Sequence, residues 1–98
     1  MIKSVLEKLV HVAKVAMEAD DAMRKLGYSH NPYFDLYGKT ADAIYIMVQE
    51  HTESFDQSAT HKLLNTKSLS VDACVSALLE ERKRNIFEME LNADGQSA

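Results

Sequence analysis

Four acidic residues have the spacing that suits a divalent metal ion. Glu18 and Asp21 are three residues apart, and so are Glu50 and Glu53. Residues three apart lie on the same side of a helix, so each pair would present two carboxylates together. Carboxylate oxygens are preferred ligands of Mg²⁺, which in such sites commonly binds substrate phosphates as well. The sequence therefore contains the parts of a magnesium site, provided that its helices bring the two pairs together.

The two acidic pairs resemble the metal-binding motifs of the all-α NTP pyrophosphohydrolases. The resemblance covers these four residues, and the two motifs stand in the opposite chain order from the family's usual one. It implies a magnesium-dependent nucleotide hydrolase, which is the alternative function that we consider. Each pair lies on the polar side of its expected helix, so the carboxylates would point apart once the apolar sides meet. We therefore interpret them as solvated surface charges and predict no metal or cofactor site.

Other chemically active residue types lack the neighbours that catalysis needs. His51 lies on an expected apolar face, and no second histidine stands three or four residues away, so we interpret it as partly buried. Cys74 lies on another apolar face, where a cysteine is typically a small buried hydrophobe. The three glycines are isolated from one another, so no glycine-rich phosphate loop is present. We predict no catalytic residue.

Composition limits the class of protein. A chain of 98 residues forms one domain, and three glycines with one proline favour long helices over strands and turns. The net charge of −4 disfavours a nucleic-acid partner, and a helix-turn-helix over residues 55–91 would present acidic side chains to DNA. A single cysteine fits a reducing compartment, and no run of 18 apolar residues exists to span a membrane. We expect a cytoplasmic protein.

The stretch from Ile2 to Leu26 predicts a long central helix. At about 100° per residue its apolar side chains cover more than half of the helix surface, so the helix must be covered from two sides. Cationic Arg24 and Lys25 precede Gly27, which is typical of a helix C-terminus. The apolar stripe consists of Ile2, Val5, Leu9, Val12, Ala16, Ala19, Met23 and Leu26, widened by Leu6, Val10, Ala13, Val15, Met17 and Ala22.

A second long helix is expected to follow. Asn31 before Pro32 predicts its N-cap and first position, with Thr40 as an alternative start. The run Ala43 to Val48 is also compatible with a buried strand, but the periodic segment is long enough to favour a helix. Its expected apolar face is Tyr37, Ala41, Ile44, Met47, Val48 and His51.

The second half of the chain predicts a short helix and a third long one. Ser54 and Gln57 have the form of a capping box, which predicts a helix from Phe55 to Leu64. Ser70 is expected to cap the last helix, which leaves the core after Leu79. We expect Phe55, Ala59 and Leu63 to face inward. The apolar stripe of the last helix is Val71, Cys74, Val75, Leu78, Leu79, Ile86 and Met89.

These patterns predict an all-α fold, a small antiparallel bundle of three long helices and one short helix with the N-terminal helix at its centre. Residues 1–91 would form the single domain, and residues 92–98, which are small and polar, a disordered tail. Acid-before-base pairs four residues apart would stabilise the helices by about 0.2–0.5 kcal/mol each. These pairs are Asp20 with Arg24, Asp21 with Lys25, and Glu80 with Arg84.

Two features favour a protein partner. The wide apolar arc of the first helix suits a homodimer, and the tyrosine-rich connection after it offers contact area of the kind that dominates interface energy. The function that we predict is therefore a small non-enzymatic interaction module, such as an adaptor, inhibitor, immunity or phage-type accessory protein. We expect the dimer interface at Leu9, Val10, Val15 and Met17, and target binding at Tyr28, His30, Tyr33, Phe34 and Tyr37.

Overall fold

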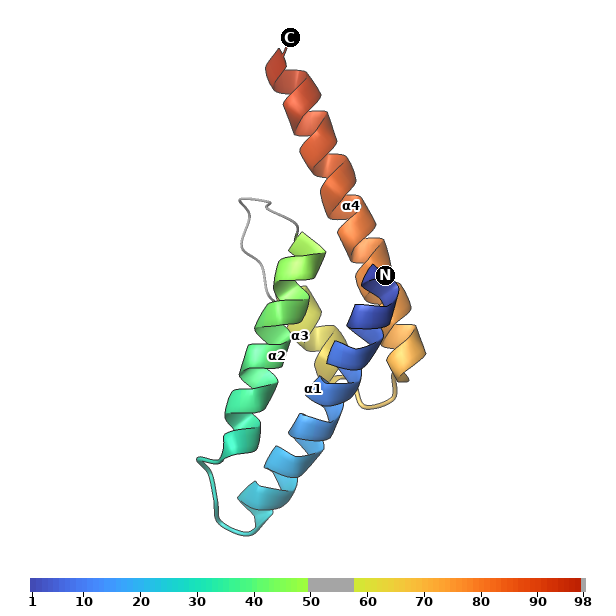
Figure 1. Cartoon of the computed structure of the whole chain (residues 1–98). Helices are drawn as coiled ribbons and strands as arrows, with labels where there is room; N and C mark the ends of the chain where they lie inside the picture. The colour runs from blue at the N-terminus through green and yellow to red at the C-terminus, as the bar shows by residue number, and fades with distance from the viewer. Residues whose placement is uncertain (50–57, 98) are drawn as a thin grey trace.

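The chain folds into a bundle of four helices, as a computed structural model shows (Figure 1). The structure describes the backbone of residues 1–49 and 58–97, and the side chains of residues 1–49 and 59–91. The helices are α1 (Ile2–Lys25), α2 (Pro32–Gln49), α3 (Ser58–Asn65) and α4 (Val71–Ser97), and no strand occurs within these described ranges. This architecture confirms the prediction of an all-α bundle with three long helices and one short helix.

Helix α1 ends in a Schellman motif. Gly27 adopts a φ of 98°, its amide donates to the carbonyl of Arg24 at 3.0 Å, and the Tyr28 amide donates to the carbonyl of Met23 at 3.0 Å. A residue with a Cβ is strained at this φ, whereas glycine is not. The other end of α1 has no side-chain cap from Met1. The C-terminus of α1 at Gly27 is therefore the one that the sequence predicts.

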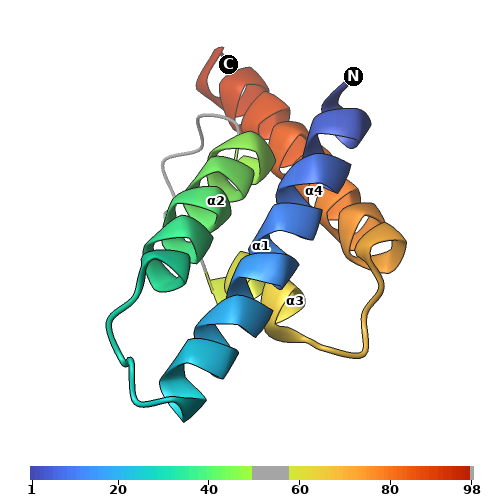
Figure 2. The same ribbon diagram turned by 60° about the horizontal axis from the view of Figure 1, so that its bottom comes forward.

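Helix α2 begins at the proline. The side-chain oxygen of Asn31 accepts hydrogen bonds from the amides of Tyr33 at 3.0 Å and Phe34 at 3.3 Å, which makes Asn31 the N-cap. The alternative start at Thr40 is wrong, because Thr40 lies within the helix and its hydroxyl donates to the Leu36 carbonyl at 2.7 Å. Helix α2 is therefore 18 residues long, and it packs antiparallel along α1 (Figure 2).

Each of the four helices packs against the other three, and the contact between α1 and α2 is the most extensive in the bundle. In α1, the fully buried residues Leu6, Val10 and Ala13 are ones that widen the expected apolar stripe, whereas Val5, Val12 and Leu26 of the stripe itself are exposed. The arc of apolar residues is wide enough that several faces could serve, so periodicity alone does not select the one that packs. Each fully buried Leu, Ile or Val side chain contributes about 1.5–3 kcal/mol. The buried core joins Leu6, Val10, Ala13, Ala41, Ile44, Val48, Leu64, Cys74, Val75 and Leu78.

Helix α3 presents a different face from the expected one. Ala59 is exposed and Leu63 only partly buried, whereas Thr60 and Leu64 are buried. The helix is described from Ser58, so the expected capping box at Ser54 and the inward position of Phe55 lie outside the described residues. The inward face of this short helix is thus shifted by one residue from the prediction.

Helix α4 begins where the sequence predicts, since the Ser70 hydroxyl accepts the Ala73 amide at 3.1 Å. The helix then runs to Ser97, through the backbone of residues 92–97, for which the sequence predicts a tail. Once a helix exists, each added residue gains a backbone hydrogen bond without a new nucleation cost. The C-terminal half of α4 projects beyond the bundle (Figure 1), which makes the molecule 59 Å long but only 24 by 21 Å across.

The core extends further along α4 than expected. Asn85 is buried and donates from its side-chain amide to the Val48 carbonyl at 3.0 Å. That carbonyl belongs to the last turn of α2, where carbonyls have no partner within the helix. Beyond this contact α4 leaves the core, and Met89 of its apolar stripe is exposed together with Phe87 and Leu91.

Candidate functional site

The connection between α1 and α2 presents aromatic side chains at one end of the bundle. Tyr28 is 58% exposed, and Tyr33 and Phe34 are 42% and 46% exposed. His30 is exposed as well, and its ring centroid lies 6.5 Å from that of Phe34. We call Tyr28, His30, Tyr33 and Phe34 the aromatic connection. Four of the five residues predicted to bind a target are therefore accessible together on one short segment.

A network of hydrogen bonds holds the aromatic connection against α1. The Asn31 side-chain amide donates to a carboxylate oxygen of Asp20 at 2.7 Å and to the Tyr28 carbonyl at 3.2 Å. Arg24 donates to both oxygens of Asp20 at 3.0 Å, and its guanidinium lies 5.3 Å from the centre of the Phe34 ring. The aromatic connection thus projects from a fixed framework, which limits the entropy lost when a partner binds.

The same network perturbs Asp20. The hydrogen bond from Asn31 is the main cause that lowers the pKa of Asp20 below its ordinary value of 3.8, with a further contribution from Arg24. A carboxylate that remains ionised accepts the hydrogen bonds from Asn31 and Arg24 at once. Asp20 therefore keeps the network intact at every pH above the usual carboxyl range.

Tyr37, the fifth predicted contact residue, is less accessible than the aromatic connection, although it lines the same cavity as Phe34. It is partly buried, and its hydroxyl hydrogen bonds to Nδ1 of His61 on α3 at 3.1 Å. Burial raises the pKa of Tyr37. Its side chain lines a cavity between the helices and supports the fold at this end of the bundle.

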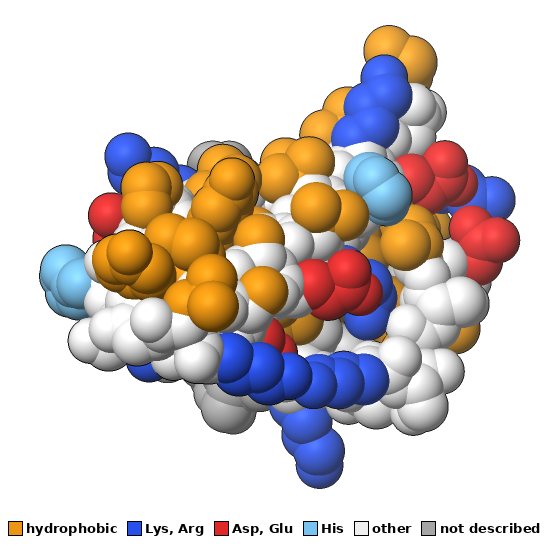
Figure 3. Space-filling model, turned by 90° about the horizontal axis from the view of Figure 1, so that it is seen from below, with side chains coloured by type: hydrophobic (Ala, Val, Ile, Leu, Met, Phe, Trp, Pro, Cys, Tyr) orange, Lys and Arg blue, Asp and Glu red, His pale blue; other side chains and the backbone are white. Residues whose placement is uncertain are grey.

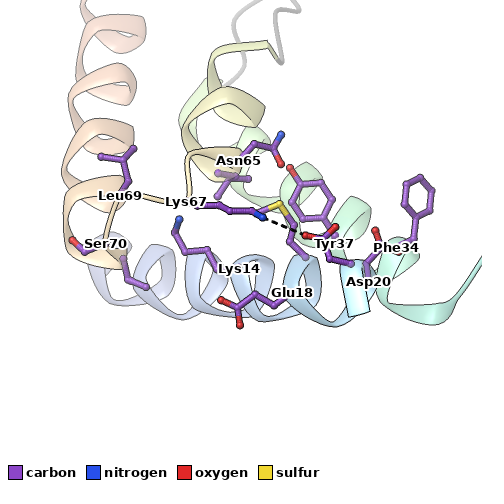
Figure 4. A pocket seen from close by; sticks show the side chains of 13 residues that line it. Lys14, Glu18, Asp20, Phe34, Tyr37, Asn65, Lys67, Leu69 and Ser70 are labelled. Carbon is purple, nitrogen blue, oxygen red and sulfur yellow. Dashed lines mark ion pairs between the residues drawn. The ribbon is translucent and has the colours of Figure 1, made fainter. Parts of the chain in front are cut away.

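That cavity has a volume of about 700 Å³ and lies between α1, α2 and the connection from α3 to α4 (Figure 4). Its walls combine apolar side chains with both signs of charge, and the Lys67 ammonium pairs with the Asp21 carboxylate at 3.7 Å. The sequence does not predict this cavity, because its walls come from segments far apart in the chain. The main lining side chains are Lys14, Met17, Glu18, Tyr37, Leu64 and Lys67.

Only one of the two acidic pairs lies within the described residues. Glu18 and Asp21 are exposed and line this cavity, whereas Glu50 and Glu53 lie outside the described residues. Asp21 pairs with Lys67 rather than with the expected Lys25. Among the described side chains, those of residues 1–49 and 59–91, no group of three or more histidine, cysteine or acidic residues is arranged to hold a metal ion.

The remaining candidates for chemistry do not form a site in the described part of the chain. Cys74 is fully buried, and burial raises the pKa of its thiol, which disfavours the reactive thiolate. His51 falls outside the residues that the structure describes. The expectation that Cys74 acts as a buried hydrophobe is confirmed.

The predicted dimer residues lie in different environments. Val10 has no exposed surface and belongs to the chain's own core, so it is not available to a second copy, contrary to prediction. Leu9 packs partly buried against the core, and Met17 lines the cavity. Only Val15, at 49% exposure, is open to solvent.

A different set of apolar residues on α1 faces solvent. Val5, Val12 and Leu26 are 44%, 37% and 74% exposed, and Ala22 is exposed with them. At the end of the molecule where α1 and α2 are connected, hydrophobic side chains gather on the surface beside Lys and Arg side chains (Figure 3). We call this side of α1, with the residue that flanks it at each end, the outer face. It consists of the exposed residues Met1, Val5, Lys8, Val12, Val15, Ala22 and Leu26 and the partly buried Ala19.

Comparisons with known proteins give no relative for this arrangement: no protein-family model, no curated protein and no solved structure matches the chain. Among the described helices, none combines the length and apolar character needed to cross a bilayer. The function must therefore be inferred from the surfaces of the molecule itself.

Proposed function

We propose that the chain is a small non-enzymatic protein-interaction module, which self-associates through the outer face of α1 and presents the aromatic connection to a protein partner. The observation that carries the proposal is the exposure of Val5, Val12, Val15 and Leu26 on one side of a helix whose other side forms the core. Contiguous exposed apolar surface on a folded protein typically marks an interaction site.

The aromatic connection supports the second part of the proposal. Tyrosine is enriched among the residues that dominate binding energy, and a contact surface held rigid before binding loses less entropy. Tyr28 and Tyr33 are exposed, and the hydrogen bonds of Asn31 fix the backbone between them. An adaptor, inhibitor, immunity or phage-type accessory protein would use such a surface, and the free thiol of Cys74 suits a cytoplasmic setting.

A charged substitution on the outer face tests the self-association. Val15→Glu places a carboxylate on this face without disturbing the core, so we expect light scattering to give the 11.0 kDa mass of one chain for the variant and twice that mass for the unmodified chain. Phe87→Glu is the matched control, because Phe87 is similarly exposed but lies on the projecting part of α4. A dimer that survives Val15→Glu would refute this interface.

The target surface needs a separate test. Tyr33→Ala should abolish capture of a protein partner from a cell extract while circular dichroism shows unchanged helix content, because the Tyr33 ring is exposed. Ile46→Ala, which removes an even more exposed apolar side chain elsewhere on α2, serves as the control. Equal capture by both variants would argue against the aromatic connection as the binding surface.

A second candidate function is magnesium-dependent nucleotide hydrolysis. The observation that favours it is the cavity of about 700 Å³, which has the size of small-molecule sites and is lined by Glu18 and Asp21 next to Lys14 and Lys67. Ligand binding to the folded state would raise the melting temperature in the presence of Mg²⁺ and a nucleotide. No increase with any member of a nucleotide panel would exclude this candidate.

A further inference from the structure

The outer face of α1 has the spacing of a helix–helix seam. Its eight residues stand alternately four and three positions apart from Met1 to Leu26, which is the a/d alternation of a coiled coil. Seven of the eight are apolar, and Lys8 is the exception. Such a seam winds around a straight helix by about 20° per heptad, so two helices keep contact along it by a slight supercoil. Its length suits an equally long helix as its partner.

We infer that the occupant of this seam is a second copy of the chain, with the two α1 helices antiparallel across a twofold axis between Val12 and Val15. This inference rests on the self-association proposed above and adds its geometry. An isologous contact of this kind needs a surface that is complementary to itself. The charge and size of the seam residues show this complementarity in the antiparallel register only.

The charge argument concerns Lys8. In a parallel pair of α1 helices in register, Lys8 would lie opposite Lys8 of the second copy, and like charges at a seam repel each other. In the antiparallel pair, Lys8 lies opposite Ala19, beside Glu18 of the second copy. Glu18 is exposed and adjacent to the outer face, so its carboxylate is placed to accept the ammonium. The antiparallel register therefore replaces a repulsion by two equivalent ion pairs.

The size argument concerns the other layers. The antiparallel register sets Val5 opposite Ala22, Val12 opposite Val15, and Met1 opposite Leu26. A larger side chain facing a smaller one fills the space between two helices more evenly than two small ones do. In the parallel register Ala19 and Ala22 would each face themselves, leaving one half of the seam thinly packed. The exposed fractions of Val5, Val12 and Val15 show that no described segment of the chain covers these positions.

The antiparallel arrangement has a functional consequence. The aromatic connection follows the C-terminus of α1, so the two copies would present it at opposite ends of the dimer, separated by roughly the 36 Å length of a 24-residue helix. Such a dimer binds two target molecules at once. A bivalent module of this kind gains avidity only for targets that are themselves linked or clustered.

Disulfide trapping tests the orientation. Val5→Cys and Ala22→Cys variants are mixed, oxidised mildly and run on a non-reducing gel, with the buried Cys74 left in place. We expect a cross-linked dimer from the mixture and none from Val5→Cys alone, because two Val5 positions would be about 25 Å apart in the antiparallel pair. Phe87→Cys mixed with Ala22→Cys is the control and should give no cross-link.

Each other result has a distinct meaning. Cross-linking of Val5→Cys with itself would show a parallel pair and overturn the inference. A dimeric mass without any cross-link from the mixture would show that the second copy binds elsewhere, which also overturns it. A monomeric mass for the unmodified chain would instead refute the proposed self-association. Circular dichroism of each cysteine variant verifies that its helix content is unchanged.

Discussion

Asn31 acts on two helices at once. Its side-chain oxygen caps α2, and its side-chain amide donates to Asp20 of α1. The sequence predicts the cap, because the Asn-Pro pair indicates it locally, and it also predicts the pairing of Asp20 with Arg24. The bond from Asn31 to Asp20 could not be predicted, because it depends on the path of the chain through Gly27. Asp21 likewise pairs with a residue far away in the chain, Lys67, instead of Lys25. Arg84 pairs within α4, but with Glu81 three residues before it instead of Glu80.

Replacing Asn31 should destabilise the fold. Asn31→Ala removes the cap of α2 and a donor to Asp20, so we expect the free energy of unfolding in urea to fall by about 1–2 kcal/mol. Asn31→Asp keeps a capping oxygen but sets a carboxylate against Asp20, so it should be destabilised too. An Asn31→Ala variant as stable as the unmodified chain would contradict this role.

Asp20 should make stability depend on acid pH. Its pKa is lowered in the folded state, so its stabilisation is fully present above the unfolded value near 3.8 and is lost as the pH falls through the folded pKa. We therefore expect Asp20→Asn to be less stable than the unmodified chain at pH 7, with the gap narrowing below about pH 4. Urea unfolding at several pH values measures this gap. A constant gap down to pH 3 would contradict the ionised network.

At the scale of elements, the sequence predicts where the helices lie better than which way they face. Three helices with caps and stop residues appear near their expected bounds, since those features act within a few residues. The inward faces of α1 and α3 are shifted because apolar residues surround most of α1, and because α3 is too short to show a clear period. Asn85 lies past Leu79, where the sequence predicts that the last helix leaves the core. In the structure its side-chain amide donates to a carbonyl at the end of α2.

Asn85 should be essential to the contact between α2 and α4. Asn85→Leu leaves the Val48 carbonyl buried without this donor, which should lower the free energy of unfolding by about 1–3 kcal/mol. Urea denaturation measures the loss. Glu88→Leu, one turn further along the same helix and exposed, is the control and should change stability little. Equal effects from both substitutions would show that the carbonyl of Val48 does not depend on Asn85.

At the scale of the whole molecule, the bundle covers one side of its central helix and leaves the other side open. The sequence predicts that α1 needs cover from two sides, and the structure shows which side its own chain supplies. The cavity beside α1 could not be predicted, because it requires the relative positions of three helices and a connection. The account therefore depends on whether a second copy covers the outer face of α1.

The most direct test is sedimentation equilibrium of the unmodified chain over a broad range of concentrations. We predict a reversible equilibrium that approaches twice the 11.0 kDa mass of one chain as the concentration rises. A mass of 11.0 kDa at every concentration would contradict the account, because Val5, Val12 and Val15 would then remain exposed to water.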